Sequence, residues 1–368
     1  MTQVGQDGSR WGASREPKPR RDSSKPLLEV DDLYVEFRTG DGVAKVINGV
    51  TYSLQAGETL AILGESGSGK SVSAQAVMGI LDTPPGYITA GQIRFHGDDM
   101  ITMRESARRD IRGKRIAMIF QDALSALNPV FTVGWQISEM LRKREGLSKK
   151  EARERAVELM DLVRIPAARE RLKSFPHQFS GGMRQRVMIA MSLAERPELI
   201  IADEPTTALD VTVQAQIMDL LKDLQRELGT GLILITHDMG VVADVADRIA
   251  VMYAGRIVEH ADVHSLYAEP AHPYTIGLLT SIPRLDDKGK QLRTIRGLPP
   301  NLTRIPDGCP FHPRCQYVQD ICLTVKPPVM DLGGGRTSEC HFSDRILAGE
   351  MSPNPVAGDE AAPGEEDK

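Results

Sequence analysis

Four short apolar runs, each followed by a conspicuous polar residue or turn, constrain the fold of this 368-residue chain more than any other feature. The runs lie at 60–63, 116–120, 199–202 and 232–236, and they lead into a glycine-rich turn, Gln121, two acids and His237. Apolar runs of this length between helical patterns are typical of buried parallel strands. Because ligands bind at the carboxyl ends of strands in an open α/β sheet, we expect these polar groups to meet at one edge.

The first of the four polar groups is a glycine-rich turn. Segment 64–71 reads GESGSGKS and fits the phosphate-binding pattern G-x-x-x-x-G-K-[ST]. The glycines let backbone N–H groups face phosphate oxygens, and the N-terminus of a following helix, predicted at 72–81, adds positive potential. Lys70 is expected to neutralise the β- and γ-phosphates of a nucleotide, and the Ser71 hydroxyl to bind Mg²⁺. The expected phosphate-site residues are Gly64, Ser66, Gly67, Ser68, Gly69, Lys70 and Ser71.

Two adjacent acids follow the third apolar run. Asp203 suits the Mg²⁺ carboxylate of a phosphoryl-transfer enzyme, and Glu204 is a candidate to polarise the attacking water. Two acids at a strand end also serve as a helix cap, and it is the glycine-rich turn upstream that favours the catalytic interpretation. Gln121 and His237 supply further polar groups for the γ-phosphate, by the same strand-end argument.

Composition excludes several classes of protein. The chain has 45 basic and 50 acidic side chains and only 5% aromatic residues, which argues against binding nucleic acid through charge or base stacking. No apolar run approaches the roughly 20 residues needed to cross a bilayer. The polar, Pro- and Gly-containing stretches 1–26 and 346–368, the second of them acidic, are typical of disordered tails.

The order of these motifs resembles that of ABC transporter ATPases. Segment 179–185, FSGGMRQ, is similar to the family's signature sequence, although its Phe and Met differ from the commonest LSGGQ form. Segment 208–210, ALD, resembles the D-loop, Gln121 the Q-loop glutamine and His237 the switch histidine. The resemblance covers residues 27–265. It implies an α/β fold, a P-loop NTPase domain of the ABC type with a helical subdomain at about 122–190.

The resemblance also implies a composite active site. Two such domains pair head to tail, and the signature of each closes over the nucleotide that the other holds. The implied contacts to the partner's ATP come from Ser180, Gly181, Gly182, Gln185 and Asp210. Phe37 falls where the family places an aromatic ring on adenine, and the implied Mg²⁺ ligands are Ser71, Gln121 and Asp203. Because the chain has a single P-loop and a single signature, the partner ATPase is expected to be another chain.

Two regions resemble one branch of the family, the peptide and nickel importers. These are segment 121–129, QDALSALNP, and an extension at 266–345 that contains HPYT at 272–275, SIP at 281–283 and GLPP at 297–300. The resemblance implies ATP hydrolysis that powers import of di- or oligopeptides, as a peripheral subunit at the cytoplasmic face of the cell membrane. Its implied partners are a related but distinct ATPase, two transmembrane permease subunits and an extracellular solute-binding protein. Import of nickel or another small solute, and a soluble ABC ATPase not coupled to transport, are the alternatives.

All four cysteines lie in this extension, at Cys309, Cys315, Cys322 and Cys340. The spacing C-x5-C-x6-C-x17-C lacks the tight C-x-x-C pairs of zinc ribbons. With no export signal, a reducing compartment is expected, and a metal site is favoured over disulfides. Four thiolates suit a [4Fe–4S] cluster, which relatives in this branch carry, and zinc or free thiols are the alternatives. The expected role of such a cluster is structural, because metal binding supplies folding free energy.

Overall fold

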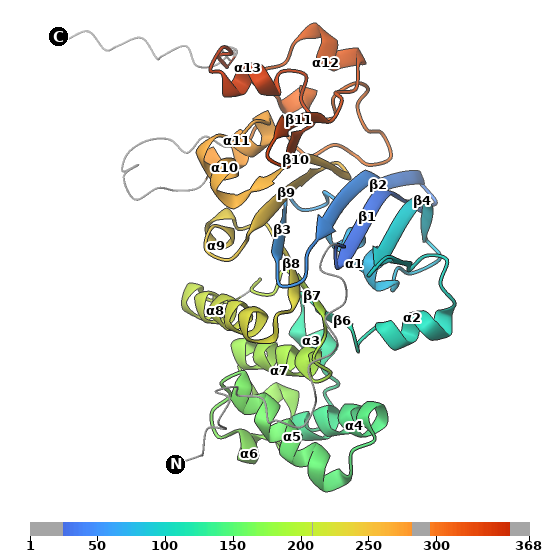
Figure 1. Cartoon of the computed structure of the whole chain (residues 1–368), viewed down its shortest axis with the longest axis vertical. Helices are drawn as coiled ribbons and strands as arrows, with labels where there is room; N and C mark the ends of the chain where they lie inside the picture. Colours follow the sequence, from blue (N-terminus) through green and yellow to red (C-terminus); the bar gives the residue numbers. More distant parts are fainter. Residues whose placement is uncertain (1–24, 208, 282–294, 354–368) are drawn as a thin grey trace, which may run out of the picture.

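The computed structural model describes residues 25–207, 209–281 and 295–353. Within these ranges eight strands form the central sheet. In chain order they are β3 (Thr59–Leu63), β6 (Ile116–Ile119), β7 (Leu199–Asp203), β8 (Gly231–Thr236), β9 (Arg248–Tyr253), β10 (Arg256–Asp262), β11 (Met330–Gly333) and β12 (Arg336–Ser338). Their spatial order is β11-β12-β10-β9-β3-β8-β7-β6 (Figure 1). Strands β9, β3, β8, β7 and β6 run parallel, as the four apolar runs predict.

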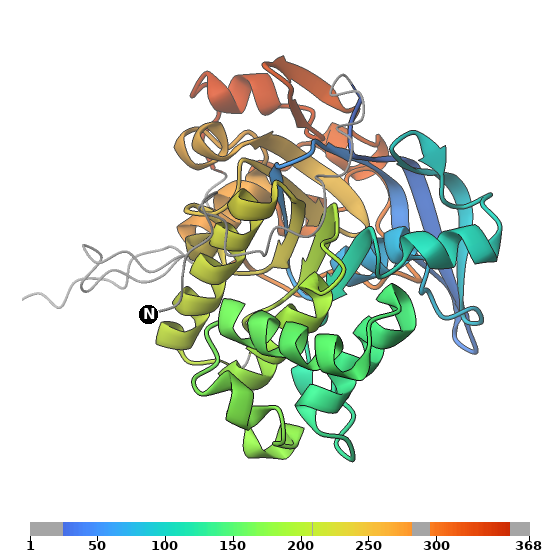
Figure 2. The same ribbon diagram turned by 60° about the horizontal axis from the view of Figure 1, so that its bottom comes forward.

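A smaller antiparallel sheet lies beside the central one (Figure 2). Its strands, in spatial order, are β2 (Gly42–Leu54), β1 (Leu28–Thr39), β4 (Gly86–Phe95) and β5 (Asp98–Asp99). Apolar side chains of this sheet, of helix α1 (Lys70–Met78) and of one face of the central sheet form a single buried cluster. The smaller sheet therefore covers the face of the central sheet on which α1 lies.

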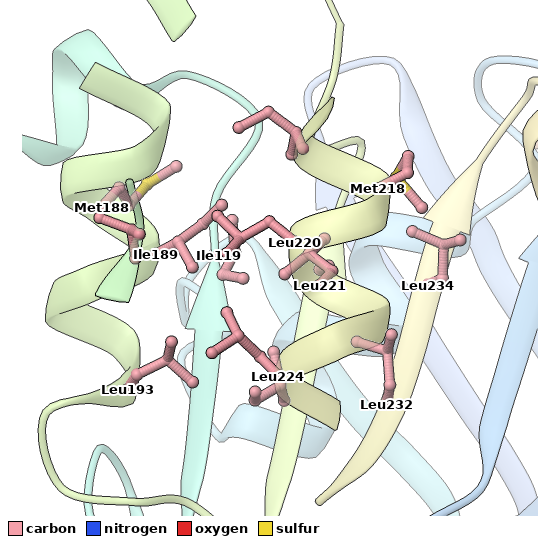
Figure 3. Packing of buried hydrophobic residues seen from close by; sticks show 14 of the residues in the cluster. Ile119, Met188, Ile189, Leu193, Met218, Leu220, Leu221, Leu224, Leu232 and Leu234 are labelled. Carbon is pink, nitrogen blue, oxygen red and sulfur yellow. The ribbon is translucent and has the colours of Figure 1, made fainter. Parts of the chain in front are cut away.

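The central sheet is buried on both faces. Along β3, Leu60 and Ile62 belong to the cluster on one face, and Ala61 and Leu63 belong to the cluster on the other. Because successive side chains of a strand point to opposite faces, a strand covered on both sides is apolar throughout. Figure 3 shows the second face, where helices α7 (Gly181–Leu193) and α8 (Val211–Leu228) pack on the strands of the sheet.

The remaining helices lie mainly in two regions. The helical insertion between β6 and α7 contains α3 (Ala123–Ala126), α4 (Val133–Glu145), α5 (Lys149–Leu162), α6 (Ala168–Arg171) and the short 3-10 helix η1 (Pro176–Gln178). The others are α2 (Glu105–Ile111), α9 (Met239–Val242), α10 (Val263–Ala268), α11 (Pro273–Thr280), the 3-10 helix η2 (His312–Arg314), α12 (Asp320–Thr324) and α13 (Ser343–Leu347). The insertion and the C-terminal extension lie at opposite ends of the molecule (Figure 1).

Local chemistry explains where helices begin and end. The Ser148 side chain accepts the N–H of Glu151, and the Glu151 carboxylate accepts the N–H of Ser148, so the predicted capping box at the start of α5 is confirmed. Helix α1 ends at Met78, short of the predicted 72–81, because Gly79 adopts a left-handed φ of 64°. No helix among the described residues combines the length and apolar character that a bilayer span requires.

The C-terminal extension continues the central sheet. Strand β12 pairs antiparallel with β10, with Glu259 opposite Ser338. Arg256 on β10 donates to both carboxylate oxygens of Glu339, at 2.6 and 2.5 Å, and both side chains are nearly buried. A buried bidentate pair fixes the relative geometry of the two segments it joins. Most of the two predicted tails, residues 1–24 and 354–368, lies outside the described ranges, as do Ala208 of the D-loop segment and residues 282–283 of the SIP segment.

Candidate active site

Parallel pairing brings the predicted polar residues to one edge of the central sheet. Leu63 at the end of β3 pairs with Thr236 at the end of β8, and Ile119 at the end of β6 pairs with Ala202 near the end of β7. The residues that directly follow these strands therefore start from the same edge. The predicted convergence is confirmed by contacts that centre on Glu204.

Three side chains surround the Glu204 carboxylate. Gln121 Nε2 donates to Glu204 Oε2 over 3.1 Å, and Thr207 Oγ1 donates to the same oxygen over 2.8 Å. His237 Nδ1 lies 3.4 Å from Glu204 Oε1. Glu204 itself has a φ of 45°, a left-handed conformation that is rare for residues other than glycine, and its N–H donates to the carbonyl of Ile235. Strained backbone of this kind is typical of functional sites.

The glycine-rich loop forms a tight cradle before α1. A Cβ on Gly64, whose φ is 154°, would lie 2.2 Å from the Met252 carbonyl oxygen, so only glycine fits there. The Lys70 ammonium is buried and donates to the carbonyls of Gly64 and Glu65, at 2.8 and 2.9 Å. Burial lowers the pKa of Lys70, and the nearby carboxylates of Glu204, Asp203 and Glu65 oppose this effect. Ser66 and Gly67 are exposed at the mouth of the loop.

A hydroxyl and a carboxylate meet where a metal ion would be needed. Ser71 Oγ donates to Asp203 Oδ1 over 2.9 Å. Hard oxygen donors of these two kinds are the ligands that Mg²⁺ prefers, so the pair fits the ion. Gln121, the third predicted ligand, is bound to Glu204 instead in this structure. Burial raises the pKa of Asp203, and the bond from Ser71 partly offsets this rise.

Ser68 provides an independent sign that the cradle receives a ligand. Its hydroxyl is buried within the loop and has no hydrogen-bond partner among the described residues. A buried polar atom without a partner is costly, and a phosphate oxygen in the cradle would supply one. The backbone N–H of Ser68 donates weakly, over 3.3 Å, to the carbonyl of Glu65.

The predicted signature forms an exposed turn at the start of α7. Ser180 is the N-cap and accepts the N–H of Met183 over 3.3 Å. Gly181 and Gly182 follow, and a Cβ on Gly182 would lie 2.5 Å from Val213 of α8. Asp210 is the N-cap of α8 and accepts the N–H of Val213 over 2.9 Å.

The turn and the residue expected to accompany it differ in exposure. Gln185, predicted to act with the turn, is 4% exposed on α7, and its amide nitrogen has no partner among the described residues. Ser180 and Gly181 are open to solvent. The turn at 180–182 is therefore the part of the signature that is available to a second molecule.

Phe37 lies on the antiparallel sheet, whose strand β2 contacts the glycine-rich loop. It is half-buried at the end of β1, opposite Ala44 of β2 and Gly86 of β4. Two residues along β2 from Ala44, the Val46 carbonyl comes so close to Gly69 that a Cβ there would lie 2.7 Å from it. The antiparallel sheet thus carries the predicted aromatic residue to the side of the glycine-rich loop.

The four cysteines line one small cavity in the extension. The wall of this cavity also includes His272, His312 and His341. Burial raises the pKa of Cys309 to about 11 and that of Cys315 and Cys340 to about 12. Within the described ranges, however, no three His, Cys, Asp or Glu side chains are grouped closely enough to hold a metal ion. The cysteines are gathered as predicted, but not as a preformed set of ligands.

Two residues that contribute to the site, Thr207 and Glu65, were not predicted from the sequence. Thr207 binds Glu204, and its position three residues later in the same turn was the available signal. Glu65, within the glycine-rich loop, binds Tyr274 and Arg314 of the extension. The signal for that pairing was a carboxylate inside a phosphate-binding loop, because a nearby cation is needed to neutralise such a charge.

Asp203→Asn is expected to stabilise the fold at neutral pH. A carboxyl whose folded pKa lies above its unfolded value opposes folding when ionised, and Asn keeps the oxygen that accepts from Ser71. The gain should shrink as the pH falls toward the ordinary Asp pKa of about 3.9, where the native carboxyl is also protonated. Urea unfolding across this range measures it. Exposed Asp219→Asn is the control, and an equal or larger gain at acidic pH would contradict the prediction.

The chain resembles known proteins over most of its length. Residues 47–207 match the family model described as ABC transporter, and residues 258–322 match that of the oligopeptide/dipeptide transporter C-terminal region. The oligopeptide transport ATP-binding protein OppD of Bacillus subtilis is 53% identical over 317 residues, which cover 86% of this chain and 87% of that protein. OppD of Salmonella typhimurium is 51% identical over 328 residues, which cover 89% and 96% of the two chains.

Solved structures agree with this assignment. A dimeric post-hydrolysis state of the ATP-binding cassette MJ0796, bound to ADP and Pi, aligns with a TM-score of 0.58 at 28% identity. The alignment covers 64% of this chain and 99% of that one. On the combined match of the cassette and the C-terminal region, the chain belongs to the ABC transporter ATP-binding proteins, in the oligopeptide/dipeptide branch.

Proposed function

We propose that this chain hydrolyses ATP to power the import of oligopeptides, as the nucleotide-binding subunit of an ABC transporter. The observation that carries the proposal is the Glu204 carboxylate, which Gln121, Thr207 and His237 surround at the sheet edge that also bears the glycine-rich loop. The OppD proteins, about half identical over most of their length, support oligopeptides as the solute. Nickel or another small solute is the alternative that transport experiments separate from this one.

The residues of the site divide the reaction between them. Lys70, which donates to two loop carbonyls, would exchange them for phosphate oxygens, and the free Ser68 hydroxyl would join it. Mg²⁺ held by Ser71 and Asp203 would neutralise charge that develops on the phosphates. Glu204 would orient and polarise the water that attacks the γ-phosphate. Gln121 and His237, which now contact that carboxylate, are placed to turn toward the γ-phosphate.

The active site is proposed to be shared with a second ATPase. The Ser180 turn is a helix N-terminus with two glycines, which favours an anion, yet its described contacts are to α7 and α8 and not to the glycine-rich loop. A phosphate brought by another subunit would satisfy it. The dimeric MJ0796 cassette with ADP and Pi supports such an arrangement. The partner is proposed to be a related but distinct chain, which makes a heterodimer.

The helical insertion is the proposed contact to two transmembrane permease subunits. Val130, Phe131 and Trp135 are 70%, 38% and 44% exposed, and the two rings stack at 4.0 Å. They follow Gln121 closely in the sequence, so a permease at this patch would be linked to occupancy of the γ-phosphate site. Together with an extracellular solute-binding protein, these contacts would make the chain a peripheral subunit at the cytoplasmic face of the cell membrane.

Glu204→Gln is expected to separate nucleotide binding from turnover. The amide keeps the size of the side chain but loses the charge that polarises water, so steady-state ATP hydrolysis should fall at least about 100-fold while Mg·ATP still binds. Cells in which this variant replaces the chain should lose uptake of a labelled oligopeptide. Glu170→Gln, an exposed change on α6, should retain both activities.

Two results would contradict the proposal. Near-normal turnover of Glu204→Gln would show that the Glu204 carboxylate does not polarise the attacking water. Unchanged oligopeptide uptake in cells that lack the chain, together with loss of nickel uptake, would replace the proposed solute by the alternative one.

We further propose a [4Fe–4S] cluster at Cys309, Cys315, Cys322 and Cys340. All four side chains line the same cavity, and thiolates are the donors that such clusters use. Because burial keeps three of the thiols protonated, binding must release protons and draw the cysteines closer together. The proposed role is to fix a segment that is rich in proline and glycine.

Anaerobic purification tests this cluster. The full chain is expected to be brown, with about four iron and four sulfide ions per molecule. Cys322→Ser should lose most of this iron and lower the thermal midpoint of unfolding, whereas exposed Ser352→Ala should change neither. A colourless and iron-free chain that is fully folded, or one that carries zinc, would refute the cluster.

A further inference from the structure

The extension contacts the glycine-rich loop at Glu65. Arg314 donates from Nη1 to Glu65 Oε2 over 2.6 Å and from Nη2 to Glu65 Oε1 over 2.9 Å. The Glu65 N–H donates to the Tyr274 hydroxyl over 2.8 Å, and its carbonyl accepts from Lys70 over 2.9 Å. Every polar group of Glu65 is therefore engaged, and two of its partners, Arg314 and Tyr274, belong to the extension.

Arg314 is built into the extension as a fixed group. Its side chain is only 4% exposed, and it is the last residue of η2. Phe311, which directly precedes η2, packs against the rings of Tyr253 and Tyr274. The N–H of Arg314 donates to the carbonyl of Phe311 over 3.0 Å, and its Nε donates to the carbonyl of Arg296. Its hydrogen bonds to Glu65 raise the pKa of the guanidinium. Such a preorganised fork loses little entropy when it binds a carboxylate.

Glu65 poses an electrostatic problem for a loop that binds phosphate. A carboxylate beside a triphosphate repels it, and a carboxylate free to turn toward Lys70 would also compete for that ammonium. The pairing with Arg314 offsets both effects, because it neutralises the charge and fixes the orientation of the carboxylate. The Tyr274 hydroxyl fixes the backbone of the same residue.

We propose that Arg314 is a positioning residue for ATP binding, supplied by the C-terminal extension, which neutralises Glu65 of the glycine-rich loop and holds it in place. The extension is then part of the nucleotide site as well as an attachment to the sheet. This inference rests on the proposed function of the loop as the ATP site. It gives a function to the ion pair between Glu65 and Arg314, which are 249 residues apart in the sequence.

The test measures the affinity of the full chain for Mg·ATP. Arg314→Ala is expected to weaken binding about tenfold, because two charge-assisted bonds are lost and the Glu65 carboxylate is left uncompensated. Arg314→Lys, which keeps the charge without the fork, should lose less. Adding Glu65→Gln to Arg314→Ala should restore the affinity to within about threefold of the native chain, because the uncompensated charge is then removed.

The rescue distinguishes positioning from folding. If Arg314 merely kept the extension folded, Glu65→Gln would restore nothing, and absence of rescue would overturn the inference. So would unchanged affinity in Arg314→Ala. Arg345→Ala, an exposed arginine of the same extension, is the matched control and should bind normally. Lys70→Ala must abolish binding in the same assay, and if it does not, the proposed function of the loop fails instead.

Discussion

The parallel register of β6, β7, β8 and β3 is the constraint on which the whole site depends. It aligns the ends of four strands, so that a loop, a carboxylate, an amide and an imidazole from widely separated positions start from one edge. A parallel sheet needs cover on both faces, and the alternation of Leu60 and Ile62 with Ala61 and Leu63 provides it. The same short strands thus both form the core and position the site residues.

This edge carries only part of the proposed active site. In the proposed function it supplies a phosphate cradle, an acid for water and donors for the γ-phosphate, whereas the turn at Ser180, proposed to bind a second anion, contacts α8. The proposed division of one site between two subunits would make turnover depend on their association. The helical insertion beyond Gln121 and the extension that bears Arg314 lie at opposite ends of the molecule. Gln121 donates to Glu204 at this edge, and Arg314 and Tyr274 of the extension bind Glu65 of the glycine-rich loop.

Much of this arrangement was predictable from the sequence, and the reasons are local. Short apolar runs identified the parallel strands, the glycine pattern identified the cradle, and Ser148 with Glu151 identified the start of α5. The pairing of Glu65 with Arg314 was not predicted, because it joins segments that share no periodicity and lie far apart in the chain. The pairing of β12 with β10 was not predicted either, because β12 has only three residues and no apolar alternation. The grouping of the cysteines was expected from their spacing, although the raised pKa of three of the thiols was not.

The most direct test of the account replaces the serine of the signature turn by arginine in both ATPase subunits, which is Ser180→Arg in this chain. The measurement is the steady-state ATP turnover of the assembled transporter. The nucleotide is claimed to lie between the glycine-rich loop of one subunit and this turn of the other. Turnover should therefore fall at least about 100-fold, although Mg·ATP still binds at the loop that contains Lys70. Turnover close to that of the native transporter would contradict the claim.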